Sequence, residues 1–263
     1  MSERYALNIL VGFAVGVAGG LIGLGGAELR LPYLVGVLGL TAHRAVPVNL
    51  AISLVVIIAA IPMRLVTLPE LSLLPFLMET IAVALGAVLA AWFGAGWLKR
   101  ISGLALNRLI FVVLLLLGLG LFAEAAISMS SDGFLPPTLA MRLIAGVLFG
   151  LVIGAISSVL GVAGGEVIIP TLVFGYGVPI KAAGSLSMMI SLPTVVAGIV
   201  RHVRFGAFAE SAIVRGVILP MGIGSVVGAI CGGLLAGLVS GAIIKTMLGF
   251  LLIWSAWKGF AKH

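Results

Sequence analysis

Residues 23–34 read GLGGAELRLPYL, and this stretch decides how the rest of the chain has to be interpreted. It directly follows a strongly apolar run, yet it holds three glycines, a glutamate, an arginine and a proline. Glycine and proline interrupt helices, and unpaired backbone groups are tolerated in an apolar environment only against protein or a water-filled cavity. The stretch therefore predicts a helix that breaks at a place where something polar has to be accommodated.

The composition places this break in a membrane protein. Hydrophobic residues make up 62% of the 263 residues, charged residues only 9%, and the mean hydropathy is +1.34. A chain this apolar cannot bury its surface in a soluble domain, whereas apolar runs of roughly 18 residues can cross a bilayer as helices. We predict an all-α, polytopic integral membrane protein with apolar runs near 6–22, 46–63, 73–97, 108–127, 140–160, 183–200, 212–238 and 242–257.

Charge and cysteine usage argue against several other classes of protein. The net charge of +7 comes without a basic block interleaved with aromatic residues, so we expect no nucleic-acid partner. The lone Cys231 allows no disulfide framework, and the three histidines show no metal-binding spacing. Because no nucleophile–base arrangement or cofactor motif occurs either, we expect no enzyme, no cofactor and no metal site.

The opening stretch has a second copy later in the chain. A shift of 138 residues places Gly23 on Gly161, Glu28 on Glu166 and Pro32 on Pro170. Such internal similarity at a fixed period indicates a duplicated unit. We predict a first transmembrane repeat over 1–130, a linker over 131–136 and a second transmembrane repeat over 137–263.

The two repeats can be parallel or inverted, depending on how the break is crossed. If each half makes four full crossings, the halves are parallel and the Lys and Arg residues divide almost evenly between the two sides. If the chain enters over 6–22, breaks and returns over 28–40, the second half is inverted, and nine Lys and Arg residues lie on one side against four on the other. The positive-inside rule favours this inverted arrangement, with both termini cytoplasmic and the broken segments meeting near the midplane of the bilayer.

Glycine-rich breaks at matching places of two inverted halves are typical of the binding site of a transporter, where helix N-termini offer N–H groups to an anion. Packing is the alternative role of such glycines, and we expect it for Gly12, Gly16, Gly150 and Gly154. The expected anion-binding groups are the backbone at the two breaks and four side chains on the helices that follow: Gly25, Gly26, Ala27, Asn49, Ser53, Ala163, Gly164, Gly165, Ser187 and Ser191.

Two carboxylates complete the expected site. Glu28 and Glu166 lie directly after the glycines, and a carboxylate inside a membrane is a functional candidate by default. We expect them to take up a proton or a cation that couples the movement of the anion, although holding the broken backbone is the structural alternative. Glu79 has no acidic counterpart in the second half, where Val217 stands, and its role stays open.

The duplicated motif also resembles a known family. Gly-x-Gly-Gly-Ala-Glu-x-x-x-Pro at 23–32 and Gly-x-x-Gly-Gly-Glu-x-x-x-Pro at 161–170 resemble the paired signatures of the sulfite exporter TauE/SafE family, also described as the toluene-sulfonate uptake permease group. The resemblance implies transport of small sulfur-containing anions across the bacterial or archaeal inner membrane. Members usually carry Thr-Ser where this chain has Val48-Asn49 and Leu186-Ser187, and often have His where Arg64 stands, so these positions bear on the choice of substrate.

The function that we predict is a secondary transporter for a small anion, a sulfur oxyanion or an organosulfonate, working by alternating access and coupled to protons. An anion channel, or a membrane subunit of a larger complex, is the alternative. Besides the substrate and the lipid bilayer, a second copy of the chain in a homodimer is a partner that the sequence leaves open.

Overall fold

The computed structural model describes residues 2–68, 72–97, 115–116, 118–122, 133–204 and 213–260. All the regular structure in these residues is helical. The first half contains α1 (Ser2–Ile22), α2 (Ala27–Gly36), α3 (Ala42–Thr67), the short η1 (Leu74–Phe76) and α4 (Leu77–Trp97). The second half contains α6 (Leu139–Leu160), α7 (Gly165–Pro170), η3 (Thr171–Gly175), α8 (Ile180–Arg204), η4 (Val214–Ile218), α10 (Leu219–Leu238) and α11 (Gly241–Phe260).

Six of these helical segments are long and apolar enough to cross a membrane, which confirms the predicted class of a polytopic α-helical membrane protein. They are Arg4–Ile22, Arg44–Thr67, Leu74–Phe93, Leu139–Ser158, Ile180–Arg204 and Val214–Leu238. Their outer faces carry exposed apolar side chains such as Leu10, Ile58, Phe93 and Ile144. Of the other predicted runs, 242–257 lies in α11, and most of 108–127 lies outside the described residues.

The chain leaves the helical path where the glycine-rich stretches predict a break. The first apolar helix ends at Ile22 and the next helix starts at Ala27, while α6 ends at Leu160 and α7 starts at Gly165. After each break a short helical segment follows, and then the longest helix of that half begins, at Ala42 in α3 and at Ile180 in α8. Both halves therefore present a free helix N-terminus in the interior of the protein.

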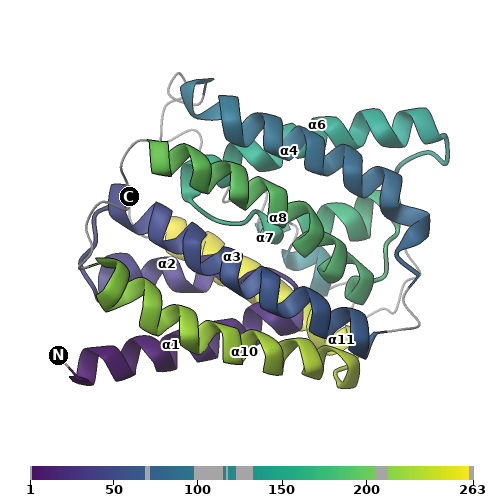
Figure 1. Ribbon diagram of the computed structural model, residues 1–263. Helices are drawn as coiled ribbons and strands as arrows, with labels where there is room; N and C mark the ends of the chain where they lie inside the picture. The colour runs from purple at the N-terminus through teal and green to yellow at the C-terminus, as the bar shows by residue number, and fades with distance from the viewer. Residues whose placement is uncertain are drawn as a thin grey trace.

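The halves are held together crosswise by glycine-lined helix pairs. α1 packs chiefly against α10, and α4 packs chiefly against α6 (Figure 1). At Gly12 an added Cβ would collide with the carbonyl oxygen of Met221, and at Gly150 with that of Val83. Such backbone-to-backbone contact is what small-xxx-small patterns provide in membranes. The packing role expected for these glycines is confirmed.

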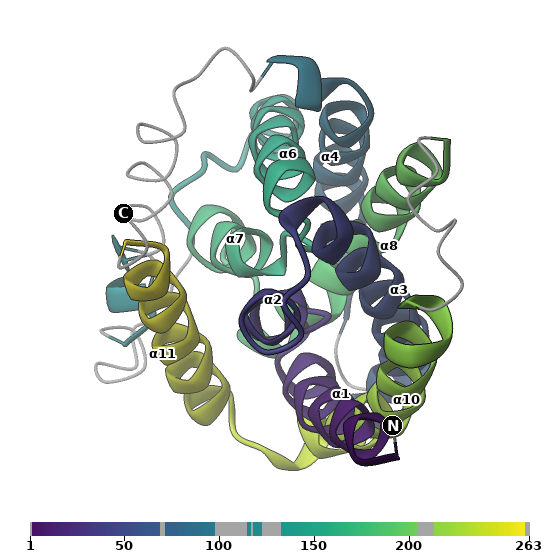
Figure 2. The same ribbon diagram turned by 90° about the vertical axis from the view of Figure 1, so that its left-hand side faces the viewer.

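α3 and α8 lie between the two glycine-lined pairs (Figure 2). They run in opposite directions, because Leu50 near the start of α3 lies against Gly198 near the end of α8, and Arg64 near the end of α3 lies against Gly184 near the start of α8. Of the most apolar window of α8, 61% is buried, compared with 22% for the peripheral α6. The polar side chains of α3 and α8 are thus in the best position to serve the two breaks.

Candidate functional site

The backbone of the two breaks adopts a conformation that favours glycine. Gly26 precedes α2 with a φ of 72°, and Gly164 precedes α7 with a φ of 81°. Residues with a side chain rarely take up this left-handed conformation. Neither N-terminus is capped by a side-chain hydrogen bond. The N-cap residue of each helix is thus a glycine, which has no side chain of its own to cap the first N–H groups.

The two breaks lie against each other. A Cβ added to Gly165 would lie 2.9 Å from the Cα of Leu24, and one added to Gly25 would lie 3.6 Å from the Cβ of Ala163. Leu24 and Ala163 are themselves fully or almost fully buried. Residues separated by 138 positions in the sequence thus form one compact region at the centre of the helices.

Arg30 is the charged residue at the first break, and it is completely buried. Its guanidinium donates to the carbonyl oxygen of Gly25 at 3.1 Å, to the backbone and side-chain oxygens of Asn49 at 3.2 and 3.1 Å, and to Ser53 Oγ at 3.1 Å. All these acceptors are neutral, and Arg30 Nε has no hydrogen-bond partner. A buried cation is costly without a counter-charge, and the nearby carboxylate of Glu28 supplies one electrostatically.

Asn49 connects the first break to the second. Its side-chain nitrogen donates to the carbonyl oxygen of Ala27 at 2.9 Å and to that of Gly161 at 3.0 Å. Both of its amide protons are therefore used on backbone carbonyls rather than left for a ligand. In this conformation Asn49 is a cross-link between the halves, and Ser53 is an acceptor for Arg30.

The second break is held by hydroxyl groups instead of a charge. Ser191 Oγ donates to the carbonyl oxygen of Ala163 at 2.9 Å, and Ser157 Oγ donates to that of Val162. Ser187, the counterpart of Asn49, is completely buried and its Oγ has no partner. The counterpart of Arg30 is the apolar Ile168. Among the predicted side-chain donors, Ser187 is the one whose hydroxyl oxygen has no hydrogen-bond partner in the described structure.

Both candidate coupling glutamates lie in the interior. Glu28 is 6% exposed and Glu166 is 4% exposed. The carboxylate of Glu28 interacts with its own backbone N–H and is attracted electrostatically by the nearby Arg30, and no other residue donates a hydrogen bond to it. A carboxylate in this position can exchange a proton more readily than one fixed in a salt bridge.

The role of Arg64 was missed by the sequence reasoning, which counted it among the loop cations. It is instead 1% exposed, and its guanidinium donates to the carbonyl oxygens of Gly20 and Leu21 at 2.9 and 2.6 Å. It also donates to Ser185 Oγ at 3.1 Å and to the carbonyl oxygen of Lys181 at 2.8 Å. Arg64 therefore ties the end of α1 to α8. The only sequence signal was its place opposite His202 in the repeat.

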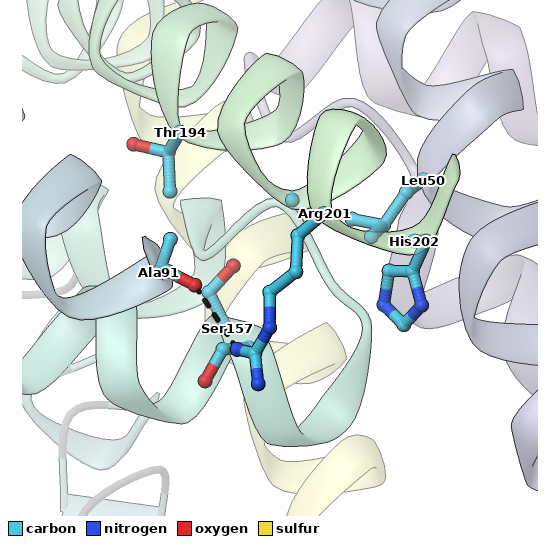
Figure 3. A pocket seen from close by; sticks show the side chains of 8 residues that line it. Leu50, Ala91, Ser157, Thr194, Arg201 and His202 are labelled. Atoms are coloured by element: carbon cyan, nitrogen blue, oxygen red, sulfur yellow. Dashed lines mark hydrogen bonds between the residues drawn. The ribbon is translucent and has the colours of Figure 1, made fainter. Parts of the chain in front are cut away.

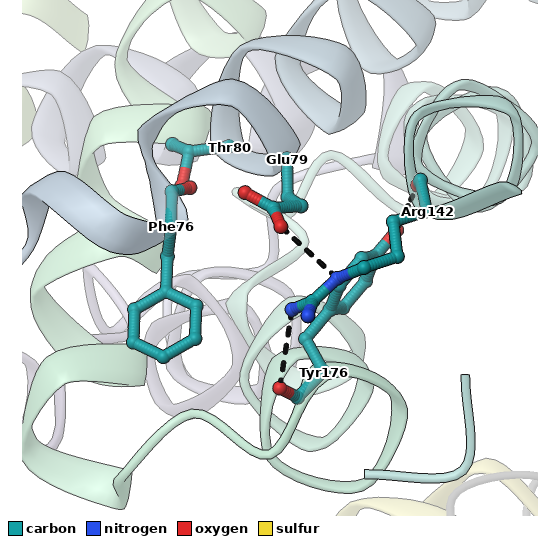
Figure 4. A network of polar contacts seen from close by, with 5 residues as sticks. All are labelled: Phe76, Glu79, Thr80, Arg142 and Tyr176. Carbon is teal, nitrogen blue, oxygen red and sulfur yellow. Dashed lines mark hydrogen bonds and ion pairs between the residues drawn. The ribbon is translucent and has the colours of Figure 1, made fainter. Parts of the chain in front are cut away.

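Glu79 has a structural partner, which the sequence did not reveal. Its carboxylate forms an ion pair of 3.0 Å with Arg142, joining α4 to α6 (Figure 4). Tyr176 donates its hydroxyl to the carbonyl oxygen of Arg142 at 3.0 Å, and its ring lies against the guanidinium. These contacts belong to the glycine-lined α4–α6 pair and give Glu79 a role in packing.

Two uncapped helix starts, a buried arginine and two buried glutamates at one place are suited to binding a small anion. No group of three or more His, Cys, Asp or Glu side chains in the described parts of the chain is placed to hold a metal ion. The family model for the sulfite exporter TauE/SafE matches residues 2–121 and 138–263. The chain belongs to this family.

Membership in the TauE/SafE family makes this chain a membrane transporter of sulfite or related anions, and the six apolar helices make it a multi-pass protein. The family match covers both glycine-rich breaks. No curated protein and no solved structure matches the chain at the significance required.

Proposed function

We propose that this TauE/SafE protein is a secondary transporter that moves a small sulfur oxyanion or organosulfonate across the bacterial or archaeal inner membrane by alternating access. The observation that carries the proposal is the contact between the two breaks, with Leu24 against Gly165 and an uncapped helix N-terminus behind each glycine cap. The N–H groups of Gly25, Gly26 and Ala27, with those of Ala163, Gly164 and Gly165, bind the anion. A single site shared by two halves is what rocking of one half against the other requires.

The direction of the helices supports the inverted arrangement of the halves. The central α3 and α8 occupy equivalent places in the repeat and run antiparallel, as Leu50 and Arg64 lie against the late and early parts of α8. In the proposed topology both termini are cytoplasmic. The anion then approaches the same pair of breaks alternately from the two sides of the membrane.

The charges at the site support a coupled mechanism. Arg30 attracts the nearby Glu28 electrostatically, its hydrogen-bond acceptors are neutral, and a bound anion shares this cation. Glu28 then carries a second negative charge next to the same cation, and binding a proton relieves the repulsion. Glu166 is buried at the second break, where Ile168 stands in place of Arg30, and is the second proton carrier. Proton movement thus accompanies the anion without any chemical change in it.

Transport by reconstituted protein tests the proposal. We expect proteoliposomes that contain the purified chain to accumulate radiolabelled sulfite or methanesulfonate when a pH gradient is imposed, and to lose this uptake when the gradient is collapsed with an ionophore. Sulfite should also raise the melting temperature of the purified protein, because a ligand stabilises the state that it binds. Uptake that is absent for every small sulfur anion, or a unitary current in bilayer recordings, would contradict a secondary transporter.

A further inference from the structure

A small cavity lies beside the second break, between α3, α4, α6 and α8 (Figure 3). Its volume is about 20 Å³, which is room for about one water molecule. Hydroxyl-bearing and basic side chains make up much of its wall, together with Leu50 and Gly198: Ser157, Thr194, Arg201 and His202. A polar cavity of this kind inside a membrane protein calls for a ligand or water.

The lining of the cavity is positive. Arg201 extends from α8 so that its guanidinium points toward Ala91 and Ser157, while His202 lies on the side of Leu50 (Figure 3). The guanidinium donates to the carbonyl oxygen of Ala91 at 3.3 Å, a neutral acceptor. Among the described residues, no Asp or Glu lines this cavity. An arginine without a neighbouring carboxylate is suited to an oxyanion, while the hydroxyls of Ser157, Ser158 and Thr194 donate to backbone carbonyls in this closed form.

The cavity adjoins the second break through Ser157. The hydroxyl of Ser157 donates to the carbonyl oxygen of Val162, inside the break. A Cβ added to Gly164, the residue that precedes α7, would lie 3.7 Å from the Cβ of Ser157. A ligand that leaves the cavity toward the interior therefore meets the second break next.

The corresponding place in the first half is filled by a side chain. The counterpart of His202 is Arg64, and the counterpart of Ser158 in the cavity wall is Gly20. The guanidinium of Arg64 donates to the carbonyl oxygen of Gly20 and reaches α8 at Lys181. The first half thus has a fixed cation where the second half has a cavity, so the two sides of the protein are closed in different ways.

We propose that this cavity is the closed form of a second anion site, which a small oxyanion occupies beside Arg201 on its way to or from the second break. When the site opens, the hydroxyls of Ser157 and Thr194 turn from the carbonyls of Val162 and Ile190 toward the anion. The proposal rests on the proposed anion transport and adds a place on its path. The site opens when Leu50 moves away from Gly198, where an added Cβ would lie 3.3 Å from Leu50 Cδ1. Gly198 leaves the anion room to pass along α8.

Kinetics of a matched pair of variants test the site. Arg201→Gln removes the charge that points into the cavity, whereas Arg204→Gln removes a charge one turn further along, whose guanidinium lies 5.0 Å from the ring of Trp92. We expect Arg201→Gln to raise the KM of sulfite uptake at least about tenfold, the usual effect of losing a hydrogen bond to a charge, and Arg204→Gln to change it by less than about twofold. Equal KM values for the two variants would overturn the proposal.

Cysteine labelling tests the site even if Arg201→Gln does not fold or the wild-type protein transports no sulfur anion. Gly198→Cys is made in a protein that also carries Cys231→Ala. It is labelled with two methanethiosulfonate reagents, one carrying a sulfonate and one a trimethylammonium group, and the ratio of the two labelling rates is measured. Val203→Cys, at an exposed position, gives the reference value of this ratio. We expect the ratio of the sulfonate rate to the trimethylammonium rate to be at least about tenfold higher at position 198 than at position 203. Added methanesulfonate should slow the labelling of position 198 by the sulfonate reagent. The same ratio at both positions, or no reaction at 198, would overturn the site while leaving the proposed transport function to be judged by the uptake assay.

Discussion

The two breaks have the same glycine backbone, but different chemistry holds each of them. The first is fixed by the guanidinium of Arg30, which reaches Gly25, Asn49 and Ser53. At the second, Ile168 stands in place of Arg30, and single hydroxyls of Ser157 and Ser191 hold the backbone. Duplication kept the shape that offers helix N-termini to an anion, while each half acquired its own means of stabilising that shape. The first break therefore has a buried arginine, and the second has an apolar side chain at the equivalent position.

The largest difference in stability between the two breaks is expected when Arg30 is removed. Arg30→Met leaves the carbonyl of Gly25 and the oxygens of Asn49 without their donor, and we expect a loss of about 3 kcal/mol in stability and no sulfite binding. Ile168→Met makes the same final side chain at the equivalent place and should cost less than about 1.5 kcal/mol. Thermal unfolding in detergent, with and without sulfite, measures both. Equal losses would mean that the two breaks do not differ in what holds them.

Replacing the two glutamates tests whether both breaks take part in proton-driven transport. Glu28→Gln and Glu166→Gln keep the size of the side chain but cannot exchange a proton, so we expect uptake driven by a pH gradient to fall at least about tenfold while sulfite still binds. Since no other residue donates to the carboxylate of Glu28, its variant should melt within a few degrees of the wild type. Undiminished gradient-driven uptake in the double variant would remove both residues from the coupling. Parallel loss of stability and binding would instead assign them to holding the backbone.

The glycine caps should respond unequally to a single methyl group. A Cβ on Gly26 would lie 2.6 Å from Val15 Cγ1, whereas one on Gly164 would lie 3.0 Å from Ile153 Cγ2. With the cost of the left-handed backbone added, we expect Gly26→Ala to lose about 2 kcal/mol and Gly164→Ala about 1 kcal/mol. Gly36→Ala, in α2 with no atom within 4 Å of the added Cβ, is the control and should lose nothing. The reverse order of melting temperatures would show that the first break is the more adaptable one.

Two serines on α8 should give the smallest effect. Ser191→Ala removes the hydroxyl that donates to Ala163 and should cost about 1 kcal/mol. Ser187→Ala removes a buried hydroxyl without a partner, so its stability should be unchanged or slightly higher. If Ser187 contacts the anion, its variant should nevertheless bind sulfite several-fold more weakly, as measured by the sulfite dependence of the melting temperature. Unchanged binding would mean that Ser187 does not contact the anion and that only backbone groups bind it at the second break.

The breaks and the membrane helices were predictable because they depend on local sequence. Gly26 and Gly164 take up a conformation that glycine allows, and apolar runs of sufficient length form membrane helices wherever they occur. The partners of the polar side chains depend on distant packing. Asn49 was expected to face the anion, but its amide is used on the carbonyls of Ala27 and Gly161, of which the second lies 112 residues away.

The buried arginines illustrate the same limit. At the end of an apolar run, Arg64 has the sequence environment of a loop cation, and only the carbonyls exposed at the end of α1 explain its burial. The ion pair of Glu79 with Arg142 likewise depends on the pairing of α4 with α6, which no local pattern specifies. Local sequence predicts where the membrane helices and the breaks lie, whereas the neighbours of a polar side chain follow from the arrangement of whole helices.

The crosswise pairing of the helices has a consequence for how the protein is made. The glycine face of α1 is completed only by α10, and Ser225 of α10 donates to the carbonyl of Gly12 across 213 residues of sequence. During synthesis α1 therefore enters the membrane long before its partner leaves the ribosome, and its small-residue face meets lipid in the meantime. Neither half can mature alone, so a chain cut between the halves should assemble only when both pieces are produced in the same cell.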